Sequence, residues 1–356
     1  MSAPIVSGAA DQRRNLLGVL TLALLLGTLP LWLNTPYALS TMILIGIYTI
    51  VTIGLCLLMG YGGQVSLGQA AFFGLGAYGS AILTVKAGWS PWVALLVAAA
   101  GTGLIAYLIG IPIFRLRGHY LAMGTLAFGV ITVIMMNEWK QYTGGPTGLP
   151  GVPRLSIAGQ PLKSDLAYYY LVWASALLAL AIALNIVNSR FGRALRAIRD
   201  SEAAAESLGV EIGRYKLQVL VTSALYASVA GSLYAHYMIF VSPTAFDFGV
   251  SVRLVLMAAV GGLASIWGAP FGTAAVMLLT LGLREIVPLL TRHGSGEYQI
   301  IAYGILLVVI MVFMPEGLVV AGMRLWRREV RSWGAVVMAR VAGYAGRLSR
   351  GSRRRS

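Results

Sequence analysis

The side chains that could perform catalysis are few in this chain and lie far apart in sequence. None of its three histidines (His119, His236 and His293) has the spacing to a cysteine or carboxylate that metal ligands show. The single cysteine, Cys56, lies within an apolar run, where we expect a small buried apolar residue. There is no Gly-Lys dipeptide and hence no phosphate-binding P-loop. We therefore expect no catalytic residue, no metal and no cofactor, and any ATP that drives this protein must be hydrolysed by another chain.

Carboxylates that could couple transport to protons or sodium ions are almost absent from the apolar segments. Glu285 is the one candidate, and it follows Arg284 near the end of its segment. A structural ion pair is the simpler interpretation there, because ion-coupled carriers usually need more intramembrane polar groups. The sequence therefore disfavours an ion-coupled carrier.

Glycine and small polar residues supply most of the polarity of the apolar segments. In the run Gly60–Tyr78, small residues recur at helical spacing, which permits close helix contact in a bilayer; they are Ser66, Ala70, Gly74 and Ala77. The alternative to packing alone is a substrate pathway. In that case Gly62 and Gly63 interrupt a helix and expose backbone groups, and polar side chains line the path, namely Gln64, Ser66 and Gln69.

A shorter run farther along the chain echoes this pattern. Gly261, Gly262 and Ser265 repeat the GG-x-x-S spacing of the first run. Transporters are often built from two similar halves. The echo predicts an internal repeat and adds these three residues to the candidate substrate pathway.

The polar stretch Arg190–Lys216, which we call the coupling segment, has six basic and four acidic residues and lies between two apolar segments. Its content of Ala, Leu, Arg and Glu favours a helix. Asp200 or Ser201 can cap a helix that starts at Glu202, and Gly209 can end it. Such a helix suits docking onto a soluble partner; the alternative is a solvated loop that only fixes orientation. The candidate contact residues are Arg193, Arg196, Arg199, Asp200, Glu202, Ala203, Ala204 and Gly209.

The elements that position these residues are expected to be membrane-spanning helices. Of the 356 residues, 58% are hydrophobic and only 11% are charged, whereas a soluble domain carries about a quarter charged residues. The predicted fold is all-α and polytopic, with about ten transmembrane helices that each cross about 30 Å of hydrocarbon. The spans are residues 16–33, 38–59, 66–85, 91–114, 119–136, 166–187, 217–238, 251–266, 270–290 and 298–314.

Three of these spans have alternatives. Residues 16–33 resemble a signal peptide in length, but no small-x-small cleavage site directly follows Leu33, so an uncleaved span is preferred. Residues 251–266 and 270–290 contain arginine or proline, and one of them is a candidate for a broken or re-entrant helix.

The distribution of Lys and Arg predicts the orientation. With residues 1–15 in the cytoplasm, twenty of the 27 basic residues fall inside, ten of them in the tail 321–356, and five fall outside. This asymmetry follows the positive-inside rule. We expect both termini and the coupling segment to be cytoplasmic, and residues 16–320 to form the membrane domain.

Two segments outside the spans suggest partners. In the tail, Leu325, Trp326 and Trp333 alternate with arginines, which is typical of an amphipathic segment on an anionic inner leaflet. We expect anionic lipids, and no nucleic acid, to bind there. The outward loop at 137–165 is rich in turn residues and is long enough to contact an external partner, with a passive connector as the alternative.

Three segments resemble one protein family: Gly62–Phe72, Ala194–Gly209 and Met314–Leu318. Together they are similar to the permease of a bacterial ABC importer for branched-chain amino acids, of the LivM type, over about residues 38–320. The resemblance implies an inner-membrane protein that works with a second homologous permease subunit, two cytoplasmic ABC ATPases and a periplasmic substrate-binding protein.

The resemblance also implies a role for the coupling segment. Glu202, Ala203, Ala204 and Gly209 resemble the EAA-x-x-x-G coupling loop of ABC importers, although Gly209 follows Glu202 by seven residues, one more than in that pattern. Related permeases for urea and short-chain amides share these features and are the alternative within the family. A stand-alone facilitator or channel is the alternative outside it. A membrane enzyme would need a clustered acid, base or metal set that the sequence lacks.

Overall fold

The computed structural model describes residues 8–32, 35–114, 116, 118–157 and 160–290. Within residues 15–282, the side chains are described except in these gaps and at residues 157, 160 and 161. The predicted span at 298–314, the Met314–Leu318 motif and the basic tail lie outside the described residues. So do the side chains of Arg284 and Glu285.

Long helices account for most of the described chain, as the apolar blocks predict. Nine of the ten predicted spans coincide with helices, and seven helical stretches are long and apolar enough to cross a membrane. The main helices are α1 (Gly8–Trp32), α2 (Pro36–Leu55), α3 (Gln69–Val85), α4 (Pro91–Ile113), α5 (His119–Glu138), α7 (Asp165–Asn188), α8 (Arg190–Asp200), α9 (Glu202–Ser207), α10 (Ile212–Met238), α11 (Phe248–Gly261) and α12 (Gly268–Leu290). The protein is therefore a nearly all-helical, multi-pass membrane protein.

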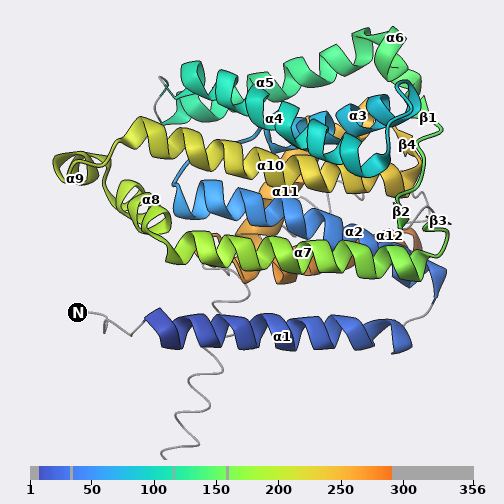
Figure 1. The fold of residues 1–356 in the computed structure, drawn as a ribbon, viewed down its shortest axis with the longest axis horizontal. Helices are drawn as coiled ribbons and strands as arrows, with labels where there is room; N and C mark the ends of the chain where they lie inside the picture. Colours follow the sequence, from blue (N-terminus) through green and yellow to red (C-terminus); the bar gives the residue numbers. More distant parts are fainter. Residues whose placement is uncertain (1–7, 33–34, 115, 117, 158–159, 291–356) are drawn as a thin grey trace, which may run out of the picture.

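Helix α2 lies at the centre of the bundle, and most of its length is buried. It packs against α7 on one side and α10 on the other, and α10 packs in turn on α3 and α4 (Figure 1). Helix α5 covers one outer edge, and α1 lies at the opposite edge against α7. The hydroxyl of Tyr169 on α7 donates to the carbonyl of Leu26, so α1 is attached to the bundle.

Local sequence signals set several helix starts. Thr35 and Ser90 each accept a hydrogen bond from a backbone N–H in the first turn of α2 and α4, and a proline follows each of them. Proline suits the first helical position because its missing N–H needs no partner there. The span of α11 is broken: a 3-10 turn, η3 (Pro243–Phe246), precedes a 14-residue helix that is capped by Asp247. At about 1.5 Å per residue, this helix alone is shorter than a bilayer core.

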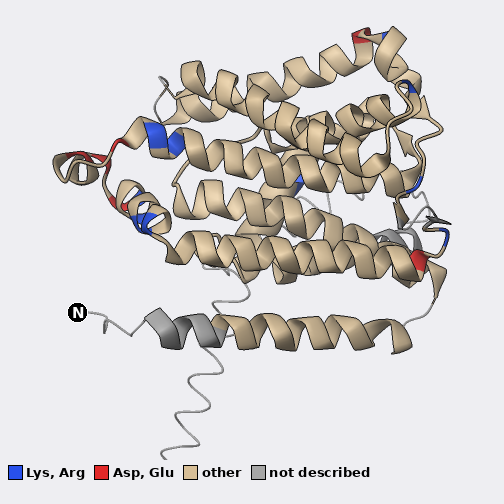
Figure 2. Ribbon diagram, viewed as in Figure 1, with Lys and Arg blue, Asp and Glu red and all other residues tan. Residues whose placement is uncertain are grey.

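Most charges lie at the two ends of the bundle, and the body between them is almost free of them (Figure 2). The coupling segment is at one end. At the other end, charged residues lie around the loop at 137–165, and Arg154 Nη1 lies 3.7 Å from Asp165 Oδ1 at the start of α7. An apolar body between two charged ends is the pattern expected for a protein that spans a membrane.

The loop at 137–165 is folded onto the end of α10. It contains α6 (Lys140–Thr143), the 3-10 turn η2 (Gly145–Thr147) and three two-residue strands: β1 (Leu149–Pro150), β2 (Ser156–Ile157) and β3 (Gln160–Pro161). Strand β1 pairs with β4 (Phe240–Val241), and β2 pairs with β3. The buried His236 joins the loop to α3, because its ring contacts the carbonyl of Pro153 at 2.6 Å and the hydroxyl of Ser80 at 2.8 Å.

Backbone-to-backbone contact holds α3 against α10. A Cβ atom on Gly231 would fall on the carbonyl oxygen of Phe73, and one on Gly76 would fall on the backbone of Ser228. Ser232 reinforces the contact by donating to the carbonyl of Gly76 at 3.1 Å. Small residues permit this approach. The glycine of α3 in this contact is Gly76, which is not in the predicted stripe, whereas Gly74 of the stripe faces Met136 and Phe246.

We expect Gly231→Ala to destabilise the protein by about 1–3 kcal/mol, because the added methyl group forces two backbones apart. The matched control is Gly101→Ala on α4, where nothing lies within 4 Å of an added Cβ. Thermal unfolding of the purified chain in detergent should show a lower midpoint for the first variant only. Equal midpoints would show that the close contact carries no stability.

Candidate functional site

The coupling segment forms two short helices that project from one end of the bundle (Figures 1 and 2). Helix α8 is amphipathic: Leu195 and Ile198 are buried against the bundle, whereas Arg193 is exposed. The segment is thus helical and packed on the membrane domain, which disfavours a loose solvated loop.

The caps of α9 follow the sequence prediction, with Ser201 as the capping residue. Its hydroxyl accepts from the N–H of Ala204 at 3.3 Å. Asp200 instead ends α8 and pairs with Arg199 at 3.1 Å. At the other end, Gly209 has φ of +79° and donates to the carbonyl of Glu206, while the next N–H reaches the carbonyl of Ala205. This is a Schellman ending, which a left-handed glycine favours.

Helix α9 presents a small, exposed tip. Ala203 and Ala204 are exposed, and the side chain of Leu208 is 81% exposed. A Cβ on Gly209 would meet no atom within 4 Å. Glu202 and Glu206 are exposed as well, so the tip combines small, apolar and acidic side chains.

Arg199 connects α8 to the end of the central helix. Its Nη1 atom donates to the carbonyl of Gly60 at 2.9 Å, and its side-chain stem lies on Gly63. The last carbonyls of a helix lack partners within the helix, and a cation there also complements the helix dipole. Two other arginines of α8 bond to carbonyls at the end of α7. Arg196 donates to the carbonyl of Val187, and Arg193 donates to the carbonyl of Asn188.

The predicted interruption at Gly62 and Gly63 is confirmed. Helix α2 continues into a π-helical turn, η1 (Cys56–Tyr61), and the chain is then non-helical until α3 begins at Gln69. Gly63 has φ of +65°, a conformation that other residues rarely adopt.

Hydroxyl groups from other helices accept hydrogen bonds from backbone N–H groups that follow this break. The N–H of Leu67 donates to Thr125 on α5 at 3.0 Å, and the N–H of Ala70 donates to Ser251 on α11 at 3.1 Å. Neither hydroxyl was predicted from the sequence. Their signal is a lone Ser or Thr within an apolar helix, which commonly hydrogen-bonds across helices.

The three polar side chains of the predicted pathway differ in their partners. Gln69 donates from Nε2 to the carbonyl and the hydroxyl of Ser223 on α10, and so joins two helices. Gln64 and Ser66 are buried, and within the described part of the chain their side-chain polar atoms have no hydrogen-bond partner. Buried polar groups without partners are uncommon, and they often mark functional positions.

The second glycine run packs against the first. Gly262 has φ of +101° and ends α11, and Ser265 donates its N–H to the carbonyl of Gly262. Gly261 lies against Gly268, and a Cβ on Gly60 would fall on the carbonyl of Leu263. In both runs the second glycine of the pair is left-handed and a helix–turn–helix results. The internal repeat nevertheless stays a prediction.

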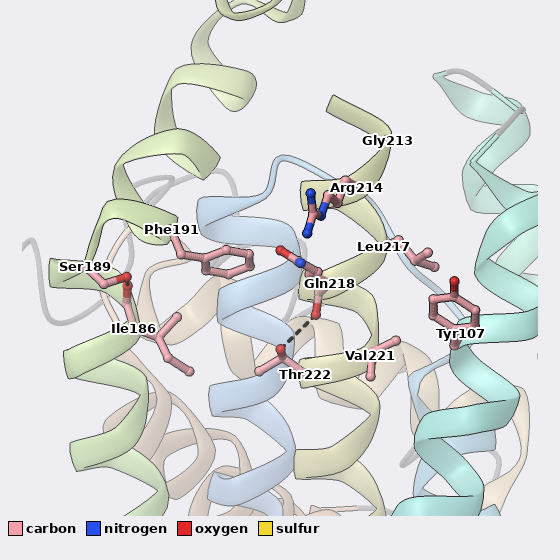
Figure 3. Close-up of a pocket in the computed structure, with 10 residues that line it drawn as sticks. All are labelled: Tyr107, Ile186, Ser189, Phe191, Gly213, Arg214, Leu217, Gln218, Val221 and Thr222. Carbon is pink, nitrogen blue, oxygen red and sulfur yellow. Dashed lines mark hydrogen bonds between the residues drawn. The ribbon is translucent and has the colours of Figure 1, made fainter. Parts of the chain in front are cut away.

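Two cavities border the coupling segment. The larger, of about 750 Å³, is an open groove between α4, α7, α8 and α10. Figure 3 shows Arg214 and Gln218 toward the coupling-segment end of this groove, with Ile186 and Val221 farther along it. None of the predicted pathway residues lines it. The smaller cavity, of about 480 Å³, brings Gly63 and Gln64 of the predicted pathway together with Glu202 of the coupling segment.

Comparison with known proteins gives the family. The family described as "Branched-chain amino acid transport system / permease component" matches residues 37–314. The chain is 32% identical to the high-affinity branched-chain amino acid transport system permease protein LivM of Escherichia coli K12, over 76% of this chain and 67% of that protein. It is 27% identical to LivH of the same strain, over 76% and 90%. It is 24% identical to the nucleoside ABC transporter permease protein NupC of Lactococcus lactis, over 49% and 59%. No solved structure matches.

The fold defines a helical, multi-pass membrane protein. The chain belongs to the family of permease components of branched-chain amino acid transport systems. The resemblance to LivM-type permeases that the three sequence segments carry is therefore confirmed.

We expect Arg199→Met to loosen α8, because the carbonyl of Gly60 then loses its charged donor. At about 1 kcal/mol for a part-exposed hydrogen bond of this kind, hydrogen exchange of the α8 amides should accelerate by about fivefold. The control is Arg193→Met, since Arg193 is exposed and, among the described residues, its side chain bonds only to the nearby carbonyl of Asn188. Mass spectrometry of both variants in detergent tests this; equal acceleration would contradict the role of Arg199.

Proposed function

We propose that this chain is a permease subunit of an ABC importer that carries branched-chain amino acids across the bacterial inner membrane. ATP hydrolysis in partner subunits drives the transport. The observation that carries the proposal is the coupling segment: an exposed helical tip, α9, continuous with a helix, α8, that is bonded to the end of the central helix.

The proposed mechanism transmits movement through that bond. One of two cytoplasmic ABC ATPases covers α9, with contacts from Arg193, Arg196, Glu202 and the alanines that follow it. When the ATPases close on ATP, they displace α8 and α9 as a rigid unit. Because Arg199 is bonded to the carbonyl of Gly60, the displacement reaches the break between α2 and α3. Switching between discrete packed arrangements of this kind is how small movements at one site open another.

The substrate assignment rests on the names of the relatives and on the small number of charged residues in the long helices. LivM and LivH are both named for branched-chain amino acid transport, whereas NupC is named for nucleosides, so the family itself leaves the substrate open. The long helices of this chain carry few fixed charges, which suits a hydrophobic amino acid. Urea and short-chain amides are the alternative substrates.

The proposal also includes partners and orientation. The positive-inside pattern supports cytoplasmic termini and a cytoplasmic coupling segment in a protein with ten spans. A second, homologous permease subunit completes the pathway, and a periplasmic binding protein delivers the substrate to the end that contains the 137–165 loop. Anionic lipids bind the basic tail.

Replacing Gly209 should uncouple ATP hydrolysis from uptake. Gly209→Leu places a branched side chain on the exposed tip and strains a φ of +79°, but no atom of the described residues lies within 4 Å of the added Cβ. We expect the variant complex to stay in the membrane and to hydrolyse ATP, with leucine uptake reduced at least tenfold. Gly209→Asn is the control, because asparagine tolerates this conformation and adds less bulk. Wild-type uptake by Gly209→Leu counts against the role.

Purification should separate the proposal from its rivals. An affinity-tagged chain extracted in mild detergent should bring down an ABC ATPase. Vesicles that contain the whole complex should take up leucine, but not urea, only with ATP and a binding protein. Uptake by the purified chain alone, without nucleotide, would establish a facilitator or channel instead.

A further inference from the structure

The larger cavity is an open groove on the side of the bundle, between α4 and α7 (Figure 3). Its floor is α10 from Arg214 to Thr222, with Tyr107 of α4 on one side and Ile186 of α7 on the other. At about 1.5 Å per residue, this part of α10 is about 12 Å long, close to the depth of one leaflet in a bilayer with about 30 Å of hydrocarbon. The volume of about 750 Å³ is within the range of small-molecule sites.

Contacts between α10 and its neighbours set the two ends of the groove. At the deep end, the hydroxyl of Tyr226 donates to the carbonyl of Ala179 at 3.0 Å and so joins α10 to α7. At the coupling-segment end, the rings of Phe191 and Tyr215 stack with centroids 5.5 Å apart, which holds α8 against α10. The groove is therefore bounded by fixed elements along its length.

Large apolar side chains border the groove on both sides. On α4, Leu104 and Ile111 flank Tyr107 at helical spacing, and all three are exposed. On α7, Ile182 is exposed one turn before Ile186. Contacts between membrane helices are enriched in small residues. This face therefore suits lipid chains better than a second helix.

The groups that can bind an anion lie at the coupling-segment end of the groove. Arg214 and Gln218 are four positions apart, on one face of α10 (Figure 3). Arg214 Nη1 lies 3.6 Å from Glu211 Oε2, but both side chains are 71% exposed. Such an exposed pair contributes little, so the guanidinium group can bind an oxyanion. At the deep end, Thr222 donates its hydroxyl to the carbonyl of Gln218.

The arrangement of these groups matches a membrane lipid. A phospholipid has a charged headgroup joined to chains that occupy one leaflet, and the groove has a cation at one end of an apolar floor about one leaflet deep. The coupling segment around its mouth has six basic residues and four acidic ones. Basic pockets between helices at the cytoplasmic side of a membrane bind anionic headgroups. Charge therefore favours an anionic lipid.

We propose that this groove binds an anionic phospholipid such as phosphatidylglycerol. The phosphate bonds to the guanidinium group of Arg214 and to the amide of Gln218. One acyl chain lies on Val221, between Ile186 and Tyr107. In the proposed orientation this is a lipid of the cytoplasmic leaflet. The site is separate from the basic tail, and it does not depend on which substrate the protein carries.

The site lies against both ends of the coupling segment. Phe191 is near the start of that segment and Arg214 is near its end, and both line the groove. A lipid bound there contacts α8 and α10 together. It therefore stabilises the base from which α9 projects.

Fluorescence quenching at the edge of the groove tests the site. A nitrobenzoxadiazole fluorophore is attached to Ile182→Cys in the full-length protein, purified with its partner subunits; Cys56 is buried and stays unlabelled. Phosphatidylcholine vesicles then supply increasing amounts of doxyl-labelled phosphatidylglycerol or doxyl-labelled phosphatidylcholine. We expect half-maximal quenching with about fivefold less phosphatidylglycerol, the preference that one arginine gives an anionic headgroup. The same fluorophore on Met123→Cys, exposed near the start of α5, should be quenched equally by both lipids.

Two variants separate the headgroup contact from the acyl-chain contact. Arg214→Gln should remove the preference for phosphatidylglycerol at Ile182→Cys. Arg193→Gln is the matched control and should keep it, because Arg193 is exposed at the same end but does not line the groove. Val221→Trp keeps the guanidinium group and fills the floor, so it should also remove the preference. A preference that survives in Arg214→Gln or in Val221→Trp overturns the inference.

Two further results would assign the groove to another occupant. If doxyl-labelled phosphatidylethanolamine quenches as well as phosphatidylglycerol, the site pairs a zwitterionic headgroup with Arg214 and Glu211, and the anionic assignment is wrong. If neither lipid quenches the fluorophore in the complex, although both quench it in the chain alone, a partner subunit covers this face and no lipid binds there.

Discussion

The hydrogen bond from Arg199 to the carbonyl of Gly60 is the contact on which the account depends. It joins the charged, projecting end of the protein to the central helix at the point where that helix stops. Helix endings leave carbonyl groups without partners, and inside a membrane they must be satisfied by the protein itself. Here the partner comes from the coupling segment. The same bond therefore satisfies a carbonyl at the break and connects the break to α8.

The rest of the bundle follows from the need to satisfy backbone groups without water. Thr125 and Ser251 supply hydroxyls to the chain after the break, and Gln69 joins α3 to α10. Where no side chain intervenes, glycines let backbones touch, as at Gly231. A few buried polar atoms of the described residues lack partners, and Gln64 is the residue in which both side-chain polar atoms do.

Much of this could be predicted from the sequence, because hydropathy and capping are local signals. Ser201, Gly209 and the interruption at Gly62 and Gly63 were identified from neighbouring residues alone. Span limits were less accurate: α10 begins at Ile212 and not near 217, since its first turns extend beyond the apolar run. The pairing of Lys216 with Glu202 was missed because the two residues are 14 positions apart, on separate helices that a turn brings together. The bond from Arg199 to Gly60 joins residues 139 positions apart, and no local pattern indicates it.

The central claim is that α9 faces the cytoplasm and is covered by an ATPase. A membrane-impermeant maleimide applied to Leu208→Cys tests it most directly, since Leu208 is highly exposed and the native Cys56 is buried. The account predicts labelling of inside-out vesicles but not of spheroplasts, and protection when the ATPase subunits are bound. Labelling of intact spheroplasts, or labelling that bound ATPases do not change, would contradict it.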